Sequence, residues 1–196
     1  MSIERASGAG TRAACTKLIL PCGAGPARKY RWKAPVLLLV KRAPAKPKVA
    51  LVGSSGGHLL HLLQLKDWYQ AYPRVWATFG KPDAVHYLAG EHVYWIHYPT
   101  NRNIRNLIRN TVVAWRLLWN ERPSLIISSG AGGAIPFFFL GRLFGARLIW
   151  IEVIDRLFSA TLTGRVVAPI SDAVIVQWDS QRDLYRNAIV LGPVFE

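Results

Sequence analysis

The stretch Val49-Ala-Leu-Val-Gly-Ser-Ser-Gly-Gly-His58, followed at once by Leu59-Leu-His-Leu-Leu63, decides the fold of this 196-residue chain. An apolar run ends in a glycine-rich turn, and the residues after the turn have the apolar content and spacing of a helix. Strand, tight turn and helix in this order form the opening unit of a doubly wound α/β sheet. Ligands bind such sheets at the carboxyl ends of the strands, so the turn is also a candidate functional site.

Short apolar runs alternate with helical patterns from residue 48 to the end of the chain. Runs that are apolar on both faces and joined by helices indicate a parallel sheet covered on both sides. The sequence therefore predicts one Rossmann-like α/β domain over residues 48–196. Its predicted strands are residues 48–52, 74–79, 92–97, 125–128, 147–153, 173–177 and 188–191, and its predicted helices are residues 58–71, 82–89, 103–121, 132–144, 163–170 and 179–185.

Residues 1–47 differ in composition from the rest of the chain. They hold ten of the 25 Lys and Arg but only one of the 11 Asp and Glu, and we expect them to form a disordered basic tail. Both cysteines, Cys15 and Cys22, lie in this tail, and their spacing fits no disulfide framework or zinc motif, which indicates a reducing compartment. We expect no signal peptide and no spanning helix, because no apolar run reaches about 18 residues.

The first glycine-rich turn is predicted to bind a polar or anionic group. Glycine permits a close approach of the main chain to a ligand, and free amides at a helix start attract negative charge. The turn matches neither the dinucleotide fingerprint nor the P-loop, and a tight turn without a ligand is the alternative. The residues predicted to contact a substrate here are Gly53, Ser54, Ser55, Gly56 and Gly57.

His58 stands at the mouth of that turn and is the candidate catalytic residue. An imidazole titrates near neutrality, so it can take a proton from an attacking hydroxyl. A helix N-terminus lowers the pKa of a histidine and favours its neutral, basic form. The alternative is a histidine that only caps or packs. The other histidines lack the spacing of metal ligands, and we expect no bound metal.

A second predicted strand, residues 125–128, also ends in a turn of small residues. Two such turns at one edge of a sheet would share a cleft, and polar residues after the next strand would lie beside them. Glu152 could accept hydrogen bonds from substrate hydroxyls, or it could pair with Arg156 or Arg165. The residues predicted to contact a substrate from this side are Ser129, Gly130, Ala131, Gly132, Glu152, Asp155 and Arg156.

Several motifs occur in a fixed order: Gly53-Ser-Ser-Gly-Gly-His58, Ile127-Ser-Ser-Gly-Ala131, Pro136-Phe137, Leu148-Ile-Trp-Ile-Glu152, Asp155-Arg156, Thr161-Leu-Thr-Gly164 and Val176-Gln-Trp178. They resemble the PssD-like subunits of capsular and exopolysaccharide glycosyltransferases and the membrane-recruiting subunit of the eukaryotic dolichol-pathway N-acetylglucosamine transferase. A more distant similarity is to the MurG-type transferases of peptidoglycan synthesis.

The resemblance implies the N-terminal, acceptor-binding half of a GT-B glycosyltransferase. A lipid-linked sugar would be the acceptor, and a partner subunit in a heterodimer or larger complex would hold the UDP-sugar donor. Transfer would invert the anomeric carbon, need no tightly bound cofactor, and serve exopolysaccharide or capsule synthesis. Two alternatives stay open: a non-catalytic membrane recruiter of a separate transferase, and a nucleotide- or nucleic-acid-binding Rossmann protein. We expect no nucleic-acid partner, because most of the excess positive charge lies in the tail.

Residues 103–119 are predicted to contact a membrane. Apolar residues recur there at helical spacing and arginines flank them, a pattern that suits an anionic bilayer surface. We expect peripheral binding to the cytoplasmic face of the inner membrane, with Arg102, Arg105 and Arg109 at the lipid headgroups. The alternative is an ordinary helix whose apolar face packs on the sheet.

A second surface is predicted to bind the donor subunit. Trp178, Val194 and Phe195 follow the last two predicted strands, at the edge where a one-chain GT-B enzyme crosses into its second domain. Exposed apolar residues at such an edge usually mark an interface. The alternative for Trp178 is a place in the domain's own core, since tryptophan is often largely buried.

Overall fold

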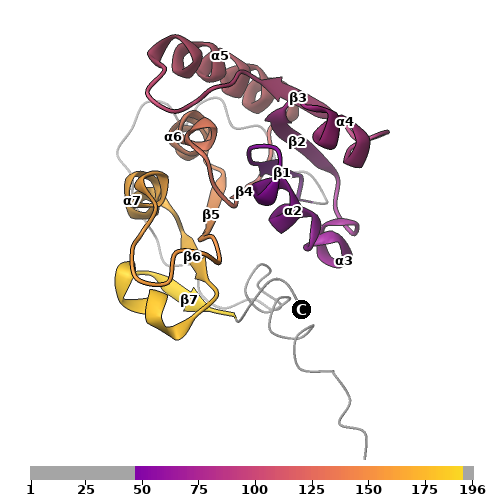
Figure 1. Cartoon of the computed structure of the whole chain (residues 1–196). Helices are drawn as coiled ribbons and strands as arrows, with labels where there is room; N and C mark the ends of the chain where they lie inside the picture. The colour runs from indigo at the N-terminus through magenta and orange to yellow at the C-terminus, as the bar shows by residue number, and fades with distance from the viewer. Residues whose placement is uncertain (1–46, 192–196) are drawn as a thin grey trace, which may run out of the picture. The chain divides into compact units, whose positions relative to one another are not determined.

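The structure, a computed structural model, describes residues 47–191, which form one seven-stranded parallel sheet (Figure 1). The strand order is β3-β2-β1-β4-β5-β6-β7, so the order reverses between β1 and β4, as in a doubly wound sheet. This confirms the predicted fold class. The strands are β1 (Val49–Val52), β2 (Arg74–Phe79), β3 (Val93–Ile96), β4 (Leu125–Ser128), β5 (Arg147–Ile151), β6 (Ala173–Val176) and β7 (Ala188–Val190).

Helices cover both faces of the sheet. On one face lie α2 (Gly57–Leu63), α3 (Lys66–Tyr69) and α4 (Pro82–Tyr87), and on the other α5 (Ile104–Glu121), α6 (Ile135–Leu143) and α7 (Leu162–Val167) lie side by side. The part of the chain that the structure describes also contains three 3₁₀ segments: η2 (Gly132–Ala134), η3 (Ala168–Ile170) and η4 (Asp179–Leu184). No helix within residues 47–191 is both long enough and apolar enough to span a bilayer.

All seven predicted strands are present, each with boundaries within two residues of the prediction. The single helix predicted over residues 58–71 is wrong. It is two helices, because the Leu65 amide bonds to the carbonyl of Leu62, three residues back, and this tighter turn ends α2. The second half of the predicted helix 163–170 is 3₁₀ around Pro169, which has no amide hydrogen. The start of the predicted helix 132–144 is also 3₁₀, over residues 132–134, and so is most of the predicted helix 179–185, over residues 179–184.

Two regions that carry predictions lie outside the described residues. The predicted basic tail, residues 1–47, does so except for its last position. Val194 and Phe195 of the predicted partner surface do so as well.

The central strands are the most buried part of the domain. Every residue of β1 and of β4 is buried, and both strands carry apolar side chains on both faces, as the sequence pattern predicts. Complete burial of a large aliphatic side chain contributes roughly 1.5–3 kcal/mol. The glycine-rich turns that follow these two strands therefore start from fixed positions.

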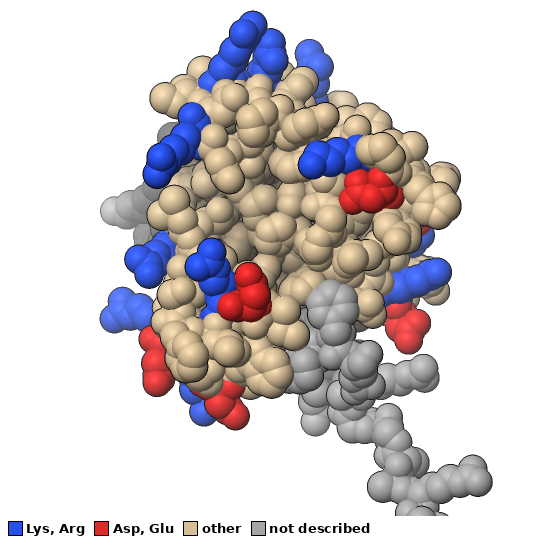
Figure 2. Space-filling view, viewed as in Figure 1, with Lys and Arg blue, Asp and Glu red and all other residues tan. Residues whose placement is uncertain are grey.

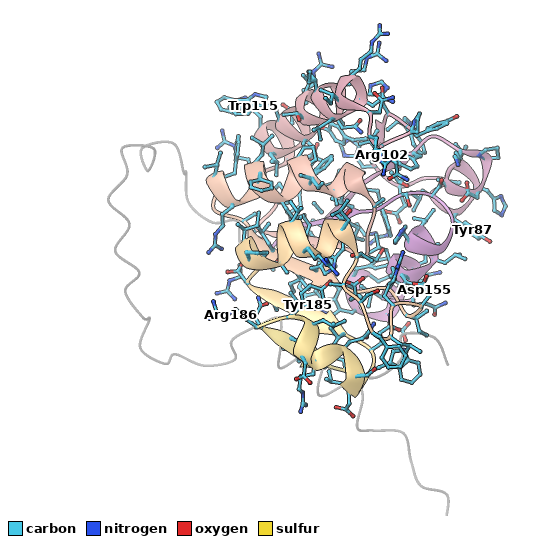
Figure 3. All side chains as sticks on the ribbon, turned by 60° about the vertical axis from the view of Figure 1, so that its left-hand side comes forward. Tyr87, Arg102, Trp115, Asp155, Tyr185 and Arg186 are labelled. Atoms are coloured by element: carbon cyan, nitrogen blue, oxygen red, sulfur yellow. The ribbon has the colours of Figure 1, made fainter. Side chains whose placement is uncertain are left out.

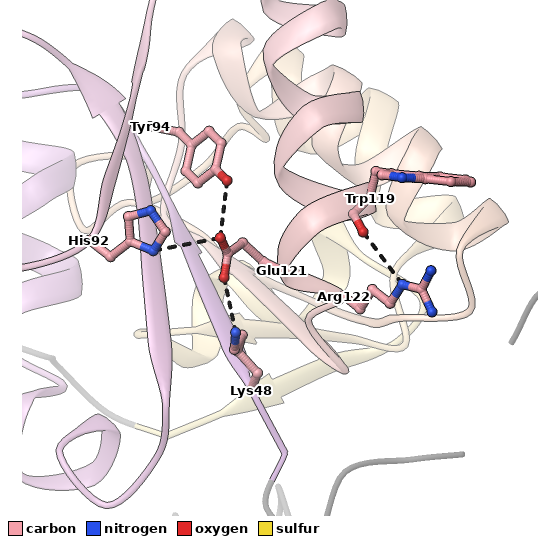
Figure 4. A network of polar contacts seen from close by, with 6 residues as sticks. All are labelled: Lys48, His92, Tyr94, Trp119, Glu121 and Arg122. Atoms are coloured by element: carbon pink, nitrogen blue, oxygen red, sulfur yellow. Dashed lines mark hydrogen bonds and ion pairs between the residues drawn. The ribbon is translucent and has the colours of Figure 1, made fainter. Parts of the chain in front are cut away.

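Glu121 fastens the end of α5 to the amino edge of the sheet (Figure 4). Its carboxylate accepts hydrogen bonds from Lys48 Nζ at 2.9 Å and the Tyr94 hydroxyl at 3.0 Å, and His92 Nδ1 lies 3.6 Å away. Burial by itself would raise the pKa of Glu121, but the bonds from Lys48 and Tyr94 outweigh it and lower that pKa. The carboxylate is therefore ionised at neutral pH and holds α5 against the starts of β1 and β3.

Candidate functional site

The two glycine-rich turns lie next to each other at the carboxyl edge of the sheet. The first follows β1 and the second follows β4, and these strands pair in parallel with Val52 opposite Ser128. Together they flank the switch point, from which the chain leaves toward opposite faces and where a crevice for a ligand forms in such sheets. The structure thus brings together the two turns that the sequence placed at one edge.

Reciprocal hydrogen bonds join the two turns. The Nδ1–H of His58 donates to the carbonyl oxygen of Ser129 at 2.9 Å, and the Ser129 hydroxyl donates to the carbonyl oxygen of His58 at 2.7 Å. Ser129 is fully buried, so water does not compete for its groups. The first turn places His58, and the second turn fixes the orientation of its ring.

The contact with Ser129 also decides which ring nitrogen of His58 carries the proton. A carbonyl oxygen only accepts, so Nδ1 must bear the hydrogen, and Nε2 of the neutral ring can accept a proton. Burial lowers the pKa of His58 below its ordinary value of 6.5, although the Ser129 bond and the charges of Asp155 and Glu152 act to raise it. At neutral pH the ring is uncharged and Nε2 is basic.

Gly130 lets the imidazole reach the second turn. Its φ of 146° lies in the region that favours glycine, and a Cβ at this position would overlap the ring of His58. The next residue, Ala131, has a φ of 73°, which is strained for a residue with a side chain. Such strain persists only where the surrounding structure imposes it, and it concentrates at functional sites.

The first turn offers fewer free amides than the sequence suggests. The Gly56 amide donates to the Asp83 carboxylate at 2.7 Å and is therefore already bonded. Ser54 is buried, whereas Ser55 is half-buried and Gly57 is exposed. A ligand at this turn would meet Ser55 and the Gly57 main chain first.

Thr100 packs against the second turn from the segment after β3. A Cβ added to Gly132 would lie 3.5 Å from the Thr100 carbonyl oxygen, and one added to Gly133 would lie 3.4 Å from the Thr100 methyl group. Sequence reasoning missed both Thr100 and Asp83, because neither lies in a turn or a motif. Their roles depend on which segments the fold places beside the glycines.

Glu152 lies inside the domain and not at its surface. Its side chain is fully buried and accepts hydrogen bonds from the hydroxyls of Tyr185 and Thr161 and from the Trp150 indole. Burial and the nearby carboxylate of Glu152 raise the pKa of Tyr185, so the tyrosine stays a protonated donor. Both predicted roles of Glu152, a substrate contact and an arginine pair, give way to this internal network, because β5 ends at Ile151 and the carboxylate turns inward.

The motif from Thr161 to Gly164 takes part in the same network. The Thr161 hydroxyl oxygen accepts the Gly164 amide hydrogen at 3.0 Å and caps α7. A Cβ at Gly164 would overlap the Tyr185 hydroxyl and the Glu152 carboxylate. The sequence motif contains Thr161 and Gly164 but does not indicate this role for them. Tyr185 was not predicted, because it lies 33 residues from Glu152 and outside every motif.

Asp155 and Arg156 lie on the loop between β5 and α7, and both are exposed (Figure 3 labels Asp155). Ser128 of β4 pairs with Trp150 of β5, so this loop emerges beside the second glycine-rich turn. Burial lowers the pKa of His58, and the charge of Asp155 acts against that shift. Within residues 47–191 no three His, Cys, Asp or Glu side chains are grouped as metal ligands would be.

Helix α5 is held to the domain by buried apolar residues near its end and by two asparagines nearer its start, while its other apolar stripe faces outward. Asn110 accepts from the His97 amide at 2.7 Å and donates to the His97 carbonyl at 3.0 Å, while Asn106 donates to the Pro99 carbonyl at 3.0 Å. Ala114, Leu117 and Leu118 of the same helix are fully buried in the core, so α5 does pack on the sheet, but the stripe that the sequence singled out does not. The exposed members of the stripe are Ile104, Leu107, Ile108, Val112, Trp115 and Trp119.

Helix α6 and several arginines extend this surface. Trp115 projects away from the molecule (Figure 3), and its ring lies 5.3 Å from that of Phe144 at the end of α6. Lys and Arg gather at the top of Figure 2, where Figure 1 places α5. We name the exposed stripe of α5 together with exposed Phe139 and Leu143 of α6 the α5–α6 surface; Arg102, Arg105 and Arg109 border it and are exposed.

Trp178 lies at the surface just after β6. Its side chain is 38% exposed, and its indole N–H donates to the Ile154 carbonyl at 3.2 Å. The alternative that places Trp178 in the core is therefore wrong. A contact between Trp178 and a partner subunit stays a prediction.

The family of the chain follows from its second half. A family model described as "Oligosaccharide biosynthesis protein Alg14 like" matches residues 93–194, just over half of the chain. The chain belongs to the Alg14-like family. The Alg14-like match contains the second turn, the Glu152 network and Trp178, while the first turn and His58 precede it.

Curated relatives agree with the Alg14-like assignment. The UDP-N-acetylglucosamine transferase subunit ALG14 of Rattus norvegicus is 24% identical, and the match covers 80% of this chain and 88% of that protein. The subunit of the same name from Homo sapiens is also 24% identical, over 52% of this chain and 54% of that protein.

A solved structure shows the same architecture. The Alg14-like chain superposes on MurG of Acinetobacter baumannii with a TM-score of 0.61 and 16% sequence identity, over 74% of this chain and 45% of that one. At this identity the likeness shows the fold alone, a Rossmann-like unit of the GT-B type that spans less than half of MurG.

Proposed function

We propose that this chain is the acceptor-binding, membrane-associating subunit of a two-part glycosyltransferase. The complex transfers a sugar from a UDP-sugar to a lipid-linked acceptor, and the setting is exopolysaccharide or capsule synthesis. The single observation that carries the proposal is His58 itself. In an Alg14-like chain, its ring is locked between two glycine-rich turns, uncharged, with Nε2 free to accept a proton.

The proposed chemistry is a single displacement. Nε2 of His58 takes the proton of an acceptor hydroxyl as that oxygen bonds to the anomeric carbon of the donor sugar. The bond from that carbon to the UDP oxygen breaks, and UDP leaves with the electron pair, so the configuration inverts. The Ser129 carbonyl keeps the ring in place and stabilises the imidazolium that forms, because its bond to Nδ1–H then becomes charge-assisted.

The two turns are proposed to hold the polar head of the acceptor. Ser55 is half-buried and Gly57 is exposed beside His58, while Gly132 of the second turn is half-buried. Main-chain amides and a hydroxyl suit the pyrophosphate of a lipid-linked sugar, and they bind oxygen anions without a metal. The acceptor hydroxyl would then meet Nε2 of His58.

The donor is proposed to bind mainly to a second subunit. The rat and human relatives are named as transferase subunits, and this chain covers 45% of the length of MurG. One Rossmann-like unit supplies one wall of a site in which two substrates must be held together. Trp178, exposed beside the loop that carries Asp155, is the described residue that we assign to the partner contact.

The α5–α6 surface is proposed to lie on the cytoplasmic face of the inner membrane. Its aliphatic and tryptophan side chains are exposed, and arginines border them. This combination favours peripheral binding to anionic lipids. The same arrangement would bring the carboxyl edge of the sheet within reach of a lipid-anchored acceptor.

Equilibrium binding to the isolated chain tests the division of labour between the subunits. We expect a short-chain polyprenyl diphosphate sugar to bind and to perturb the NMR signals of the His58 ring, because the acceptor side of the site is in this chain. A UDP-sugar should leave those signals unchanged at the same concentration. Tighter binding of the UDP-sugar than of the acceptor analogue would overturn the assignment.

A further inference from the structure

The loop between β5 and α7 is held by side chains that come from the end of β6 and from η4. Four of its main-chain carbonyls accept hydrogen bonds from three residues of that region. Gln177 Nε2 donates to the Glu152 carbonyl at 3.0 Å, and the Trp178 indole donates to the Ile154 carbonyl at 3.2 Å. The remaining two bonds come from one side chain, Gln181.

Gln181 uses its whole amide to bridge the two segments. Its Nε2 donates to the carbonyls of Val153 and Arg156, both at 3.1 Å. Its Oε1 accepts from the amides of Gln177 at 2.8 Å and Trp178 at 3.1 Å. The side chain is completely buried, so water could not replace any of these hydrogen bonds if one were lost.

The clamped loop borders the site. Strands β4 and β5 are neighbours, with Ser128 opposite Trp150, so the loop after β5 emerges beside the second glycine-rich turn. It carries exposed Asp155, whose charge acts on His58. Any displacement of this loop would move a carboxylate relative to the proposed base.

We infer that Gln181 is a positioning residue: its buried amide clamps the loop between β5 and α7 to the end of β6 and thereby fixes the position of Asp155 relative to the second glycine-rich turn, which holds His58. Gln181 itself does not touch the substrate. The effect on catalysis rests on the function proposed above, whereas the clamp and its effect on His58 exist in the chain alone.

The first test follows the titration of the His58 ring by NMR in the isolated chain. Asp155→Asn should lower the pKa of His58, since the charge of Asp155 raises it. Gln181→Met, which keeps the length and loses all four bonds, should lower it too. The double variant should match Asp155→Asn, because Gln181 acts through Asp155. An unchanged His58 titration in folded Gln181→Met, or additive shifts in the double variant, would overturn the inference.

Two further variants keep the test decisive. Trp178→Phe removes only the bond to Ile154 from a partly exposed side chain, so it should fold even where Gln181→Met does not. It should lower the pKa of His58 by a smaller amount, and the absence of any shift would again contradict the clamp. Gln70→Met changes an exposed glutamine at the end of α3 and should leave the titration as in the wild type.

The second test uses the complex with its partner subunit. Gln181→Met should lower kcat by about tenfold through misplacement of site groups, with little change in the KM for the UDP-sugar, which the partner holds. A rise in that KM with kcat unchanged would contradict a role at His58. If the wild-type complex transfers no sugar, the proposed function fails, while the NMR titration still decides the clamp.

Discussion

Replacing His58 with alanine is expected to lower the transfer rate of the two-subunit complex by roughly 100-fold or more, the usual scale for loss of a general base. The Ser129 hydroxyl donates to the main-chain carbonyl of residue 58, which alanine also has, so this hydrogen bond still joins the two turns. The variant should therefore fold and bind the partner as the wild type does. Initial rates of sugar transfer measure the loss of activity. Co-purification with the partner and thermal unfolding check that binding and folding are unchanged.

The pH dependence adds a second signature of His58. A base must be unprotonated, so the rate should fall as the pH drops through the pKa of His58, and burial places that limb below the ordinary value of 6.5. His86→Ala, at an exposed position of α4, is the matched control and should change neither the rate nor the limb. Wild-type turnover by the His58→Ala complex would remove His58 from the mechanism and favour a non-catalytic recruiter.

Membrane binding should weaken by about 100-fold when Arg102, Arg105 and Arg109 are replaced together by glutamine. Each basic residue near an anionic bilayer contributes about 1 kcal/mol, and 1.4 kcal/mol corresponds to tenfold. Co-sedimentation with vesicles that contain phosphatidylglycerol measures the effect. The difference in binding between the variant and the wild type should shrink at high salt, because screening by salt already weakens the binding of the wild-type protein to the vesicles.

A charge-matched control separates the α5–α6 surface from net charge. Replacing exposed Arg147, Arg182 and Arg186 by glutamine removes the same charge elsewhere on the domain and should change binding far less. Ile108→Ser should weaken binding at both low and high salt, since it removes apolar contact and leaves the charges. Equal losses in the two arginine triples would contradict a defined membrane surface.

The strands and the two turns were predictable from sequence because each is determined by residues that follow one another in the chain. Apolar runs on both faces mark buried parallel strands, and glycines after such runs mark turns at the carboxyl edge. The adjacency of His58 and Ser129 follows from that topology. Their reciprocal hydrogen bonds do not, since they depend on the φ of Gly130 and on the absence of a side chain there.

The buried polar groups could not be predicted in the same way. Glu152 finds its hydroxyl partners 9 and 33 residues further on, and Gln181 reaches back 25 and 28 residues to two carbonyls. No local pattern encodes such pairs. The orientation of α5 is a related case, because periodicity shows an apolar stripe but not that Asn106 and Asn110 hold the opposite face to the domain.

The break in the first helix has a local cause that the pattern hides. Residues 58–71 keep apolar side chains at spacings that one helix would also produce. The 3₁₀ bond at Leu65 shifts the direction of the chain, so that α2 and α3 each bury their own residues. A change of backbone bonding without Pro or Gly leaves little trace in sequence.

The central claim is that this chain completes a transferase only together with a donor-binding subunit. The direct measurement is transfer of labelled sugar from a UDP-sugar to a lipid-linked acceptor in anionic vesicles, with this chain alone, the candidate partner alone, and both together. We expect product at a substantial rate only when both subunits are present. Robust transfer by this chain alone, or an equal rate from the partner with and without this chain, would contradict the division of the transferase between two subunits.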